Sequence, residues 1–192
     1  MLDPDQTLGL AERVALAAER LGIRTALIGA AALAVHGYAR GTEDVDLATV
    51  VGPDTGLRAL AGALADAGLE TELRLPDEDD PLGGVLVIRG PGGDSDVVEV
   101  VNFLNPLRPR TNPAAMAIAR AYPLEGVQLR CVALADLVAL KLYAGSRSDL
   151  ADIVQLLARN PDADPNALRS IAGPFDRSGC LESLISEARA LR

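Results

Sequence analysis

The segment from residue 25 to residue 51 constrains the fold more than any other part of the chain. Short apolar and β-branched runs in it alternate with a small-residue stretch behind Gly29. The pattern predicts in order a strand, a helix, a polar connection and a strand, over residues 25–28, 30–36, 37–43 and 45–51. Strands joined through a glycine turn and a short helix need a layered fold that contains a sheet.

The remaining pattern predicts more strands first and only helices later. Helices are predicted up to Gly22 and from Pro53 to about Ala67. Further strands are predicted over 71–75, 85–89, 97–103 and 127–132, with a hairpin turn at 90–93. From residue 134 onwards only helices are predicted, over about 134–144, 147–159, 165–172 and 176–190. We therefore expect an α/β (α+β) fold whose mixed sheet is flanked by helices, with domain ranges 1–133 and 134–192.

Composition narrows the class of protein. The chain has 192 residues, of which 49% are hydrophobic and only 3% aromatic, so small and aliphatic side chains fill the core. A net charge of −9 argues against a long polynucleotide groove, although one basic patch could still hold a nucleotide or a tRNA end. The longest apolar run, 26–35, is shorter than the roughly 20 residues that span a bilayer. We expect a cytoplasmic protein without a membrane partner and with two reduced cysteines.

Two aspartates at the start of the second strand are the strongest candidates for chemistry. Asp44 and Asp46 are two positions apart, so their side chains leave a strand on the same face. Two adjacent carboxylates repel each other unless a cation lies between them, and oxygen ligands suit Mg²⁺ (or Mn²⁺). Glu99, inside an apolar strand, is the best candidate for a third metal ligand, and Asp96 is the second choice. The alternatives are a solvated strand end and an outward-pointing Glu99.

The preceding turn is a candidate phosphate site. A helix N-terminus behind a small-residue turn offers free backbone N–H groups to an anion. Gly29 and Ala30 occupy that turn, directly before the aspartate pair. The order of the parts therefore predicts nucleotide phosphates between the turn and a metal ion.

Two blocks carry a family resemblance. The first is GAAALAVHGYARGTEDVDLA, from Gly29 to Ala48, and the second is LADLVALKLYAGSRSDLAD, from Leu134 to Asp152. The first resembles the signature of the polymerase-beta-like nucleotidyltransferase superfamily. Both together resemble the AbiEii-type toxin branch and its uncharacterised relatives. The resemblance implies a nucleotidyltransferase core over 1–133, a C-terminal helical region over 134–192, and an enzyme that moves a nucleoside monophosphate from an NTP to a hydroxyl.

The resemblance also implies roles for individual residues. Asp44, Asp46 and the Glu99 position would bind Mg²⁺, and Gly29 with the Ala30 turn would hold the triphosphate. Lys141 would contact phosphate as a catalytic residue. Asp149 or Asp152 would orient Lys141, Arg147 or a substrate group. The full set of candidate substrate-binding positions, beside Gly29 and Ala30, is His36, Arg40, Thr42, Arg147, Asp149 and Asp152.

Several of these residues have a simpler interpretation. Lys141 is the only lysine and could extend from its apolar helix to water. His36, the only histidine, could cap the short helix and pack beside Gly37. Arg40 could pair with Glu43 or Asp44 in place of a phosphate. A separate set of arginines could form one basic patch for the acceptor or could be scattered in solvent: Arg108, Arg110, Arg120 and Arg130.

Two departures from the family pattern leave alternatives open. Ala30 stands where a second glycine or a serine is expected, and Glu99 stands where an aspartate is usual. The leading hypothesis is a Mg²⁺-dependent nucleotidyltransferase that acts on a tRNA end, a protein or a small molecule, as the toxin of a toxin–antitoxin pair with an antitoxin protein partner. The alternatives are a catalytically degenerate binding protein of the same fold and an aminoglycoside-type small-molecule nucleotidyltransferase. An acidic rim around the metal site would favour the last of these.

Overall fold

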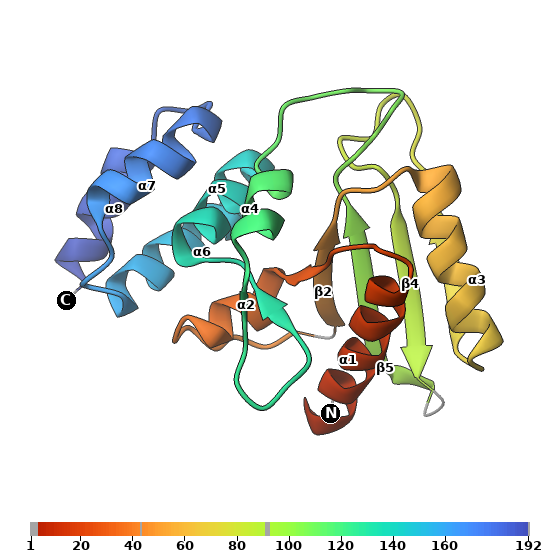
Figure 1. Cartoon of the computed structure of the whole chain (residues 1–192). Coiled ribbons are helices and arrows are strands. Elements are labelled where there is room, and N and C mark those ends of the chain that lie inside the picture. The colour runs from red at the N-terminus through yellow and green to blue at the C-terminus, as the bar shows by residue number, and fades with distance from the viewer. Residues whose placement is uncertain (1–3, 43, 91–92, 192) are drawn as a thin grey trace.

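A computed structural model describes residues 4–42, 44–90 and 93–191. Its centre is a seven-stranded mixed sheet in the order β3-β4-β5-β2-β1-β7-β6 (Figure 1). The strands are β1 (Ala26–Leu27), β2 (Asp44–Thr49), β3 (Glu70–Arg74), β4 (Val85–Gly90), β5 (Gly93–Asn102), β6 (Tyr122–Pro123) and β7 (Arg130–Cys131). The expected mixed α/β fold is therefore confirmed.

Strand direction changes across the sheet. β2 pairs with β5 in parallel, and β1 pairs with β7 in parallel. The pairs β1–β2, β3–β4, β4–β5 and β6–β7 are antiparallel. The predicted hairpin of β4 and β5 is present, although residues 91 and 92 of its turn lie outside the described residues. An all-parallel sheet is ruled out, as the hairpin signal indicated.

Helices pack on the sheet and on one another. They are α1 (Pro4–Arg20), α2 (Gly29–Val35), α3 (Arg58–Asp66), α4 (Ala114–Arg120), α5 (Leu134–Ala144), α6 (Arg147–Arg159), α7 (Pro165–Ala172) and α8 (Leu181–Ala190), with a π-helical turn at Pro53–Leu57 and a 3-10 turn at Gly173–Phe175. α1 contacts β2, β5 and α3, and α3 contacts β3. Figure 1 shows α5–α8 grouped on the side of the molecule away from α3.

One part of the core lies between the sheet and α1. Leu47, Leu86, Ile88, Val98 and Val100 from three central strands are all fully buried. Side chains alternate along a strand, so the intervening residues of β2 and β5 face the other side of the sheet. Asp44 and Asp46 of β2 and Glu99 of β5 are among those residues.

Some boundaries differ from the expectation. The strand predicted over 127–132 is limited to Arg130–Cys131, and the helix predicted from residue 176 begins at Leu181. The Asp176 carboxylate accepts hydrogen bonds from the backbone N–H groups of Cys180 and Leu181, which fixes the later start. α4 was not predicted. Both cysteines are free thiols, as expected.

None of the helices in the described parts of the chain combines the length and the apolar character that crossing a bilayer requires.

Candidate active site

Three carboxylates meet on the face of the sheet opposite α1. Asp44 and Asp46 belong to β2, and Glu99 belongs to β5, where it is the direct partner of Asp46. One carboxylate oxygen from each residue lies within 4.8 Å of the other two. Because paired residues of parallel strands point to the same face, the strand register alone brings the three groups together. We call Asp44, Asp46 and Glu99 the carboxylate cluster.

Burial and mutual repulsion make it unfavourable for all three carboxylates of the cluster to be ionised together. The pKa of Asp46 is raised from 3.8 to about 7, chiefly by burial and then by Asp44 and Glu99. The pKa of Glu99 is also raised, by burial and by Asp44, while Arg74 and Arg89 oppose the shift. A bound cation would remove this cost, because it favours the ionised carboxylates. The donor set is made only of acidic oxygens, which fits Mg²⁺ or Mn²⁺.

Gly29 fits where a larger residue would not. Its φ is +59°, in the left-handed region. A Cβ built on it would overlap the Asp46 carboxylate, with Cγ of Asp46 only 2.9 Å away. The backbone of β2 meets the same turn, since the N–H of Ile28 donates to the carbonyl of Asp46 at 3.0 Å. The start of α2 therefore lies directly against the carboxylate cluster, and Ala30 behind it is buried.

Thr42 holds one member of the cluster. Its hydroxyl donates to Oδ1 of Asp44 at 2.7 Å and lies 3.0 Å from the Asp44 backbone carbonyl. A hydroxyl bonded to an ionised oxygen forms a strong, directional contact. The structure therefore places Thr42 as a positioning contact for Asp44. Its predicted role as a substrate contact remains a prediction.

Lys141 lies in a buried charge network. Its side chain is 7% exposed, and Nζ donates to Oδ1 of Asp149 at 3.0 Å and to Oδ2 of Asp152 at 2.7 Å. Nε of Arg40 lies 3.3 Å from the other oxygen of Asp152. Lys141 and Arg40 both act to lower the pKa of Asp46, so their positive charges are close enough to influence the cluster.

This network corrects two of the simpler interpretations. Lys141 does not extend to water, because two carboxylates hold its buried ammonium group. Asp152 is the ion-pair partner of Arg40 in place of Asp44. Glu43, the other partner considered for Arg40, lies outside the described residues.

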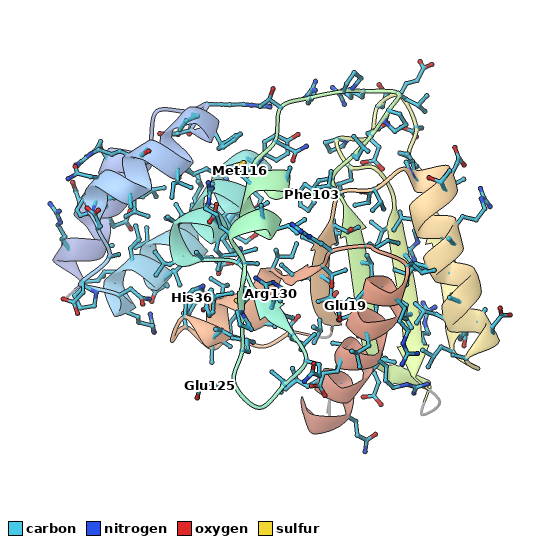
Figure 2. All side chains as sticks on the ribbon, in the orientation of Figure 1. Glu19, His36, Phe103, Met116, Glu125 and Arg130 are labelled. Atoms are coloured by element: carbon cyan, nitrogen blue, oxygen red, sulfur yellow. The ribbon has the colours of Figure 1, made fainter. Side chains whose placement is uncertain are left out.

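His36 and Arg147 lie apart from these contacts. Nε2 of His36 lies 2.9 Å from the carbonyl oxygen of Val132, and the backbone of His36 caps the C-terminal end of α2. His36 is labelled beside α2 in Figure 2. Arg147 is exposed in the first turn of α6. Among the described contacts, none joins either side chain to the carboxylate cluster, so their substrate roles remain predictions.

Other candidates are placed elsewhere. Asp96 is buried and accepts a hydrogen bond from the Thr7 hydroxyl of α1, on the opposite face from Glu99. Choosing it as a third ligand is therefore wrong, because the alternation along β5 turns it toward α1.

The proposed basic patch is not supported. Arg120 pairs with the buried Asp136, and Arg130 donates to the carbonyl of Ala121. Arg108 also donates to a backbone carbonyl in the acidic loop before β4. These guanidinium groups are engaged by the chain itself, so they do not form one free basic surface.

Two arginines beside the cluster were not identified from the sequence. Arg74 of β3 and Arg89 of β4 both contact Glu72, at 2.8 and 3.5 Å, and both act on the pKa of Glu99. The register places Glu72, Val87 and Glu99 in one row across β3, β4 and β5. A pairing of the three strands in register would have predicted this neighbourhood. The rim of the cluster therefore carries both charge signs.

Comparisons with known proteins bear on the family and the fold of the chain. The model of the family described as "Nucleotidyl transferase AbiEii toxin, Type IV TA system" matches residues 13–187. No curated protein matches the chain. Among solved structures, an antigenic nucleotidyltransferase-like protein from Paracoccidioides brasiliensis is 21% identical, covers 97% of this chain and 94% of its own, and has a TM-score of 0.57. This likeness shows the fold.

A weaker likeness exists to the antibiotic-resistance factor ANT(2'')-Ia. It is 16% identical over 100% of this chain and 91% of its own, with a TM-score of 0.49. A likeness at that level supports no inference about this chain.

Proposed function

The chain belongs to the AbiEii family of nucleotidyl transferases, and on this premise we propose that it transfers a nucleoside monophosphate from an NTP to a hydroxyl acceptor with the help of Mg²⁺. The family identifies the chain as a transferase. The observation that carries the finer proposal is the convergence of three carboxylate oxygens within 4.8 Å beside the glycine turn.

The carboxylate cluster would hold the divalent cation. Asp46 shows most clearly that a cation suits the cluster. Its pKa of about 7 reflects a buried acidic group without enough positive charge around it. The cation, when bound, would stabilise the charge that develops on phosphate oxygens and on the attacking oxygen. Thr42 would keep Asp44 in its orientation while Asp44 binds the ion.

The triphosphate would lie between the cluster and the positive side chains. The backbone N–H groups at Gly29 and Ala30 would donate to phosphate oxygens, as groups at the start of a helix do. Lys141 and Arg40 would supply positive charge on the same side. Asp152, which contacts both of them, would fix their positions.

The acceptor and the biological role are proposed from the family description. We propose a toxin whose activity is countered by an antitoxin protein, with a tRNA end, a protein hydroxyl or a small molecule as acceptor. His36 and Arg147 would contact the substrate. We also propose that residue 133 marks the boundary between the nucleotidyltransferase core and the C-terminal helical region.

A labelling experiment tests the proposal. Purified protein is incubated with Mg²⁺, total RNA or lysate, and each labelled NTP in turn. We expect transfer of label from at least one NTP, loss of transfer with EDTA, and loss in Asp46→Asn. The matched control is Glu187→Gln, an exposed acid on α8, which should retain full transfer. Absence of label with every NTP, beside a working positive control, contradicts the proposal.

Calorimetry separates the degenerate binding protein from the enzyme. Ala30 is the observation that favours degeneracy, because it offers no hydroxyl to a phosphate. An enzyme should bind the NTP more tightly with Mg²⁺ and lose this gain in Asp46→Asn. Nucleotide binding that is unchanged in Asp46→Asn, without any label transfer, would indicate the binding protein. Adding aminoglycosides to the acceptor panel tests the small-molecule alternative in the same assay.

A further inference from the structure

The order of the strands gives the carboxylate cluster two sides. Asp46 lies on β2, whose other neighbour is β1, and Glu99 lies on β5, beyond which come β4 and β3. In Figure 1, β4 and β5 lie on the α3 side of β2, whereas α5 and α6 lie on its other side. The side chains proposed to hold the triphosphate, Lys141 and Arg40, are both bonded to Asp152 of α6 and belong to the α5–α6 side.

The β3–β4 side of the cluster carries a second pair of positive side chains, Arg74 of β3 and Arg89 of β4. Both contact Glu72 of β3, at 2.8 and 3.5 Å, and Glu72 lies in one row with Glu99 across β3, β4 and β5. Adjacent strands are about 4.8 Å apart, so the two arginines lie one and two strand spacings from Glu99, roughly 5–10 Å. Burial raises the pKa of Glu99 and both arginines oppose this rise, so their charge reaches that end of the cluster.

The guanidinium group of Arg74 is accessible to a ligand. The side chain is 58% exposed, and that of its partner Glu72 is 47% exposed. In the described parts of the chain, Nε is the only nitrogen of Arg74 that donates a hydrogen bond. The terminal N–H groups of its planar fork are therefore left for another acceptor, and this fork suits the oxygens of a phosphate. Glu72 holds the fork in place from the opposite edge.

The geometry of nucleotidyl transfer assigns a different substrate to each side. When an oxygen displaces pyrophosphate from the α-phosphorus, the attacking and leaving oxygens lie roughly in line on opposite sides of the phosphorus. Pyrophosphate would leave on the side of Lys141 and Arg40, which are proposed to hold the triphosphate. The acceptor hydroxyl must then approach from the side of Glu99, and the rest of the acceptor extends over β4 and β3.

We propose that Arg74 and Arg89 bind a phosphate group of the acceptor, and that they select acceptors with a phosphate roughly 5–10 Å from the reacting hydroxyl. This role rests on the proposed nucleotidyl transfer and adds the chemistry of the acceptor to it. A nucleic-acid backbone and a phosphorylated small molecule both offer such a group, whereas the arginines would repel a polycationic acceptor.

Binding without NTP tests the site separately from turnover. One probe pair is an RNA trinucleotide with phosphodiester linkages and the same trinucleotide with neutral methylphosphonate linkages. The other pair is ribose 5-phosphate and ribose, and all four affinities are measured by calorimetry in Mg²⁺. We expect the phosphate-bearing member of at least one pair to bind about tenfold more tightly, the effect of two exposed ion pairs. The pair that shows this preference identifies the source of the phosphate, and no preference in either pair overturns the proposal.

Variants locate the preference. Arg74→Gln/Arg89→Gln should abolish it and leave the affinity for NTP with Mg²⁺ unchanged. The matched control is Arg58→Gln/Arg169→Gln, which removes two arginines paired with acids elsewhere on the surface and should keep the preference. Arg74→Gln alone should reduce the preference to about threefold, and it keeps the test valid if the double variant fails to fold. A preference that survives in the double variant, or an equal loss of NTP affinity, overturns the proposal.

The labelling assay distinguishes a failure of this site from a failure of the transfer. In Arg74→Gln/Arg89→Gln we expect the KM for the acceptor to rise about tenfold with little change in kcat, because the lost contact is far from the reacting atoms. Transfer with an unchanged KM for the acceptor overturns the acceptor site and leaves the transfer standing. Absence of transfer in the unsubstituted protein overturns the transfer itself, and with it the assignment of the bound phosphate to an acceptor.

Discussion

Replacing Asp46 by asparagine should stabilise the metal-free protein at neutral and alkaline pH while removing its affinity for divalent cations. The folded protein raises the pKa of Asp46 from 3.8 to about 7, mainly through burial and also through Asp44 and Glu99. The difference is about 3 pKa units, and each unit is worth about 1.4 kcal/mol. Ionised Asp46 therefore costs the folded state about 4 kcal/mol, a cost that a neutral asparagine does not have.

The direction of the pH dependence follows from the raised pKa. Between about pH 4 and pH 7 the folded state keeps a proton on Asp46 that the unfolded chain has released. The free energy of unfolding therefore falls as the pH rises through this window, and the loss is complete above about pH 7. The gain in Asp46→Asn should be near zero around pH 4 and should approach about 4 kcal/mol around pH 8.

Urea unfolding in EDTA at several pH values measures this difference. Repeating the titration with excess Mg²⁺ should stabilise the unsubstituted protein at pH 8 and leave Asp46→Asn unchanged, because only the former binds the ion. Glu187→Gln, an exposed acid on α8, is the control for loss of one surface charge. A stability difference between Asp46→Asn and the unsubstituted protein that stays constant from pH 4 to pH 8 would refute the reasoning.

Three further substitutions test separate contacts. Gly29→Ala should abolish divalent-cation binding and destabilise the fold, because the added Cβ overlaps the cluster and φ is +59°. Thr42→Val should weaken Mg²⁺ binding, measured by calorimetry, by about tenfold, the effect of losing one hydrogen bond to a charged group. Arg120→Met should lower the free energy of unfolding by about 2–3 kcal/mol, because it leaves the buried Asp136 without its cation.

Each of these substitutions has an internal comparison. Gly37→Ala also adds a Cβ at positive φ, but nothing lies within 4 Å of it. It should therefore cost only about 1–2 kcal/mol of backbone strain and keep its cation affinity. Equal cation affinity in Gly29→Ala and Gly37→Ala would contradict the steric argument. The free energy of unfolding of Thr42→Val should be close to that of the unsubstituted protein. Arg120→Met should retain its Mg²⁺ affinity, because the Arg120–Asp136 pair is separate from the carboxylate cluster.

Local patterns predicted the parts of the site that lie close together in the sequence. The glycine at the start of α2 and the aspartates two positions apart on β2 both lie in one segment of the sequence. The choice of Glu99 rested on a carboxylate inside an apolar strand, and the pairing of Asp46 with Glu99 places this residue beside the two aspartates. An acid in such a strand needs compensation, and the nearby acids make a cation the natural source of it.

Local sequence patterns did not predict the contacts between distant segments. Arg40 and Asp152 meet because α6 folds back over the loop after α2, and no periodicity in either segment specifies this. The contact of Asp96 with Thr7 of α1, which holds Asp96 away from the cluster, likewise joins distant segments. The small-residue sequence of α4 has no clear apolar period, and this helix packs against α5 and β2.

The register of β2 against β5 also determines which changes in chain length the site can tolerate. Residues 50–84 leave β2 and return through a separate hairpin strand, so insertions in the loops of that segment leave Asp46 opposite Glu99. A single deletion inside β5 would instead turn Glu99 toward α1 and present an apolar neighbour to the two aspartates. Divergent relatives should therefore vary widely in the spacing between these acids while keeping the length of β5 fixed.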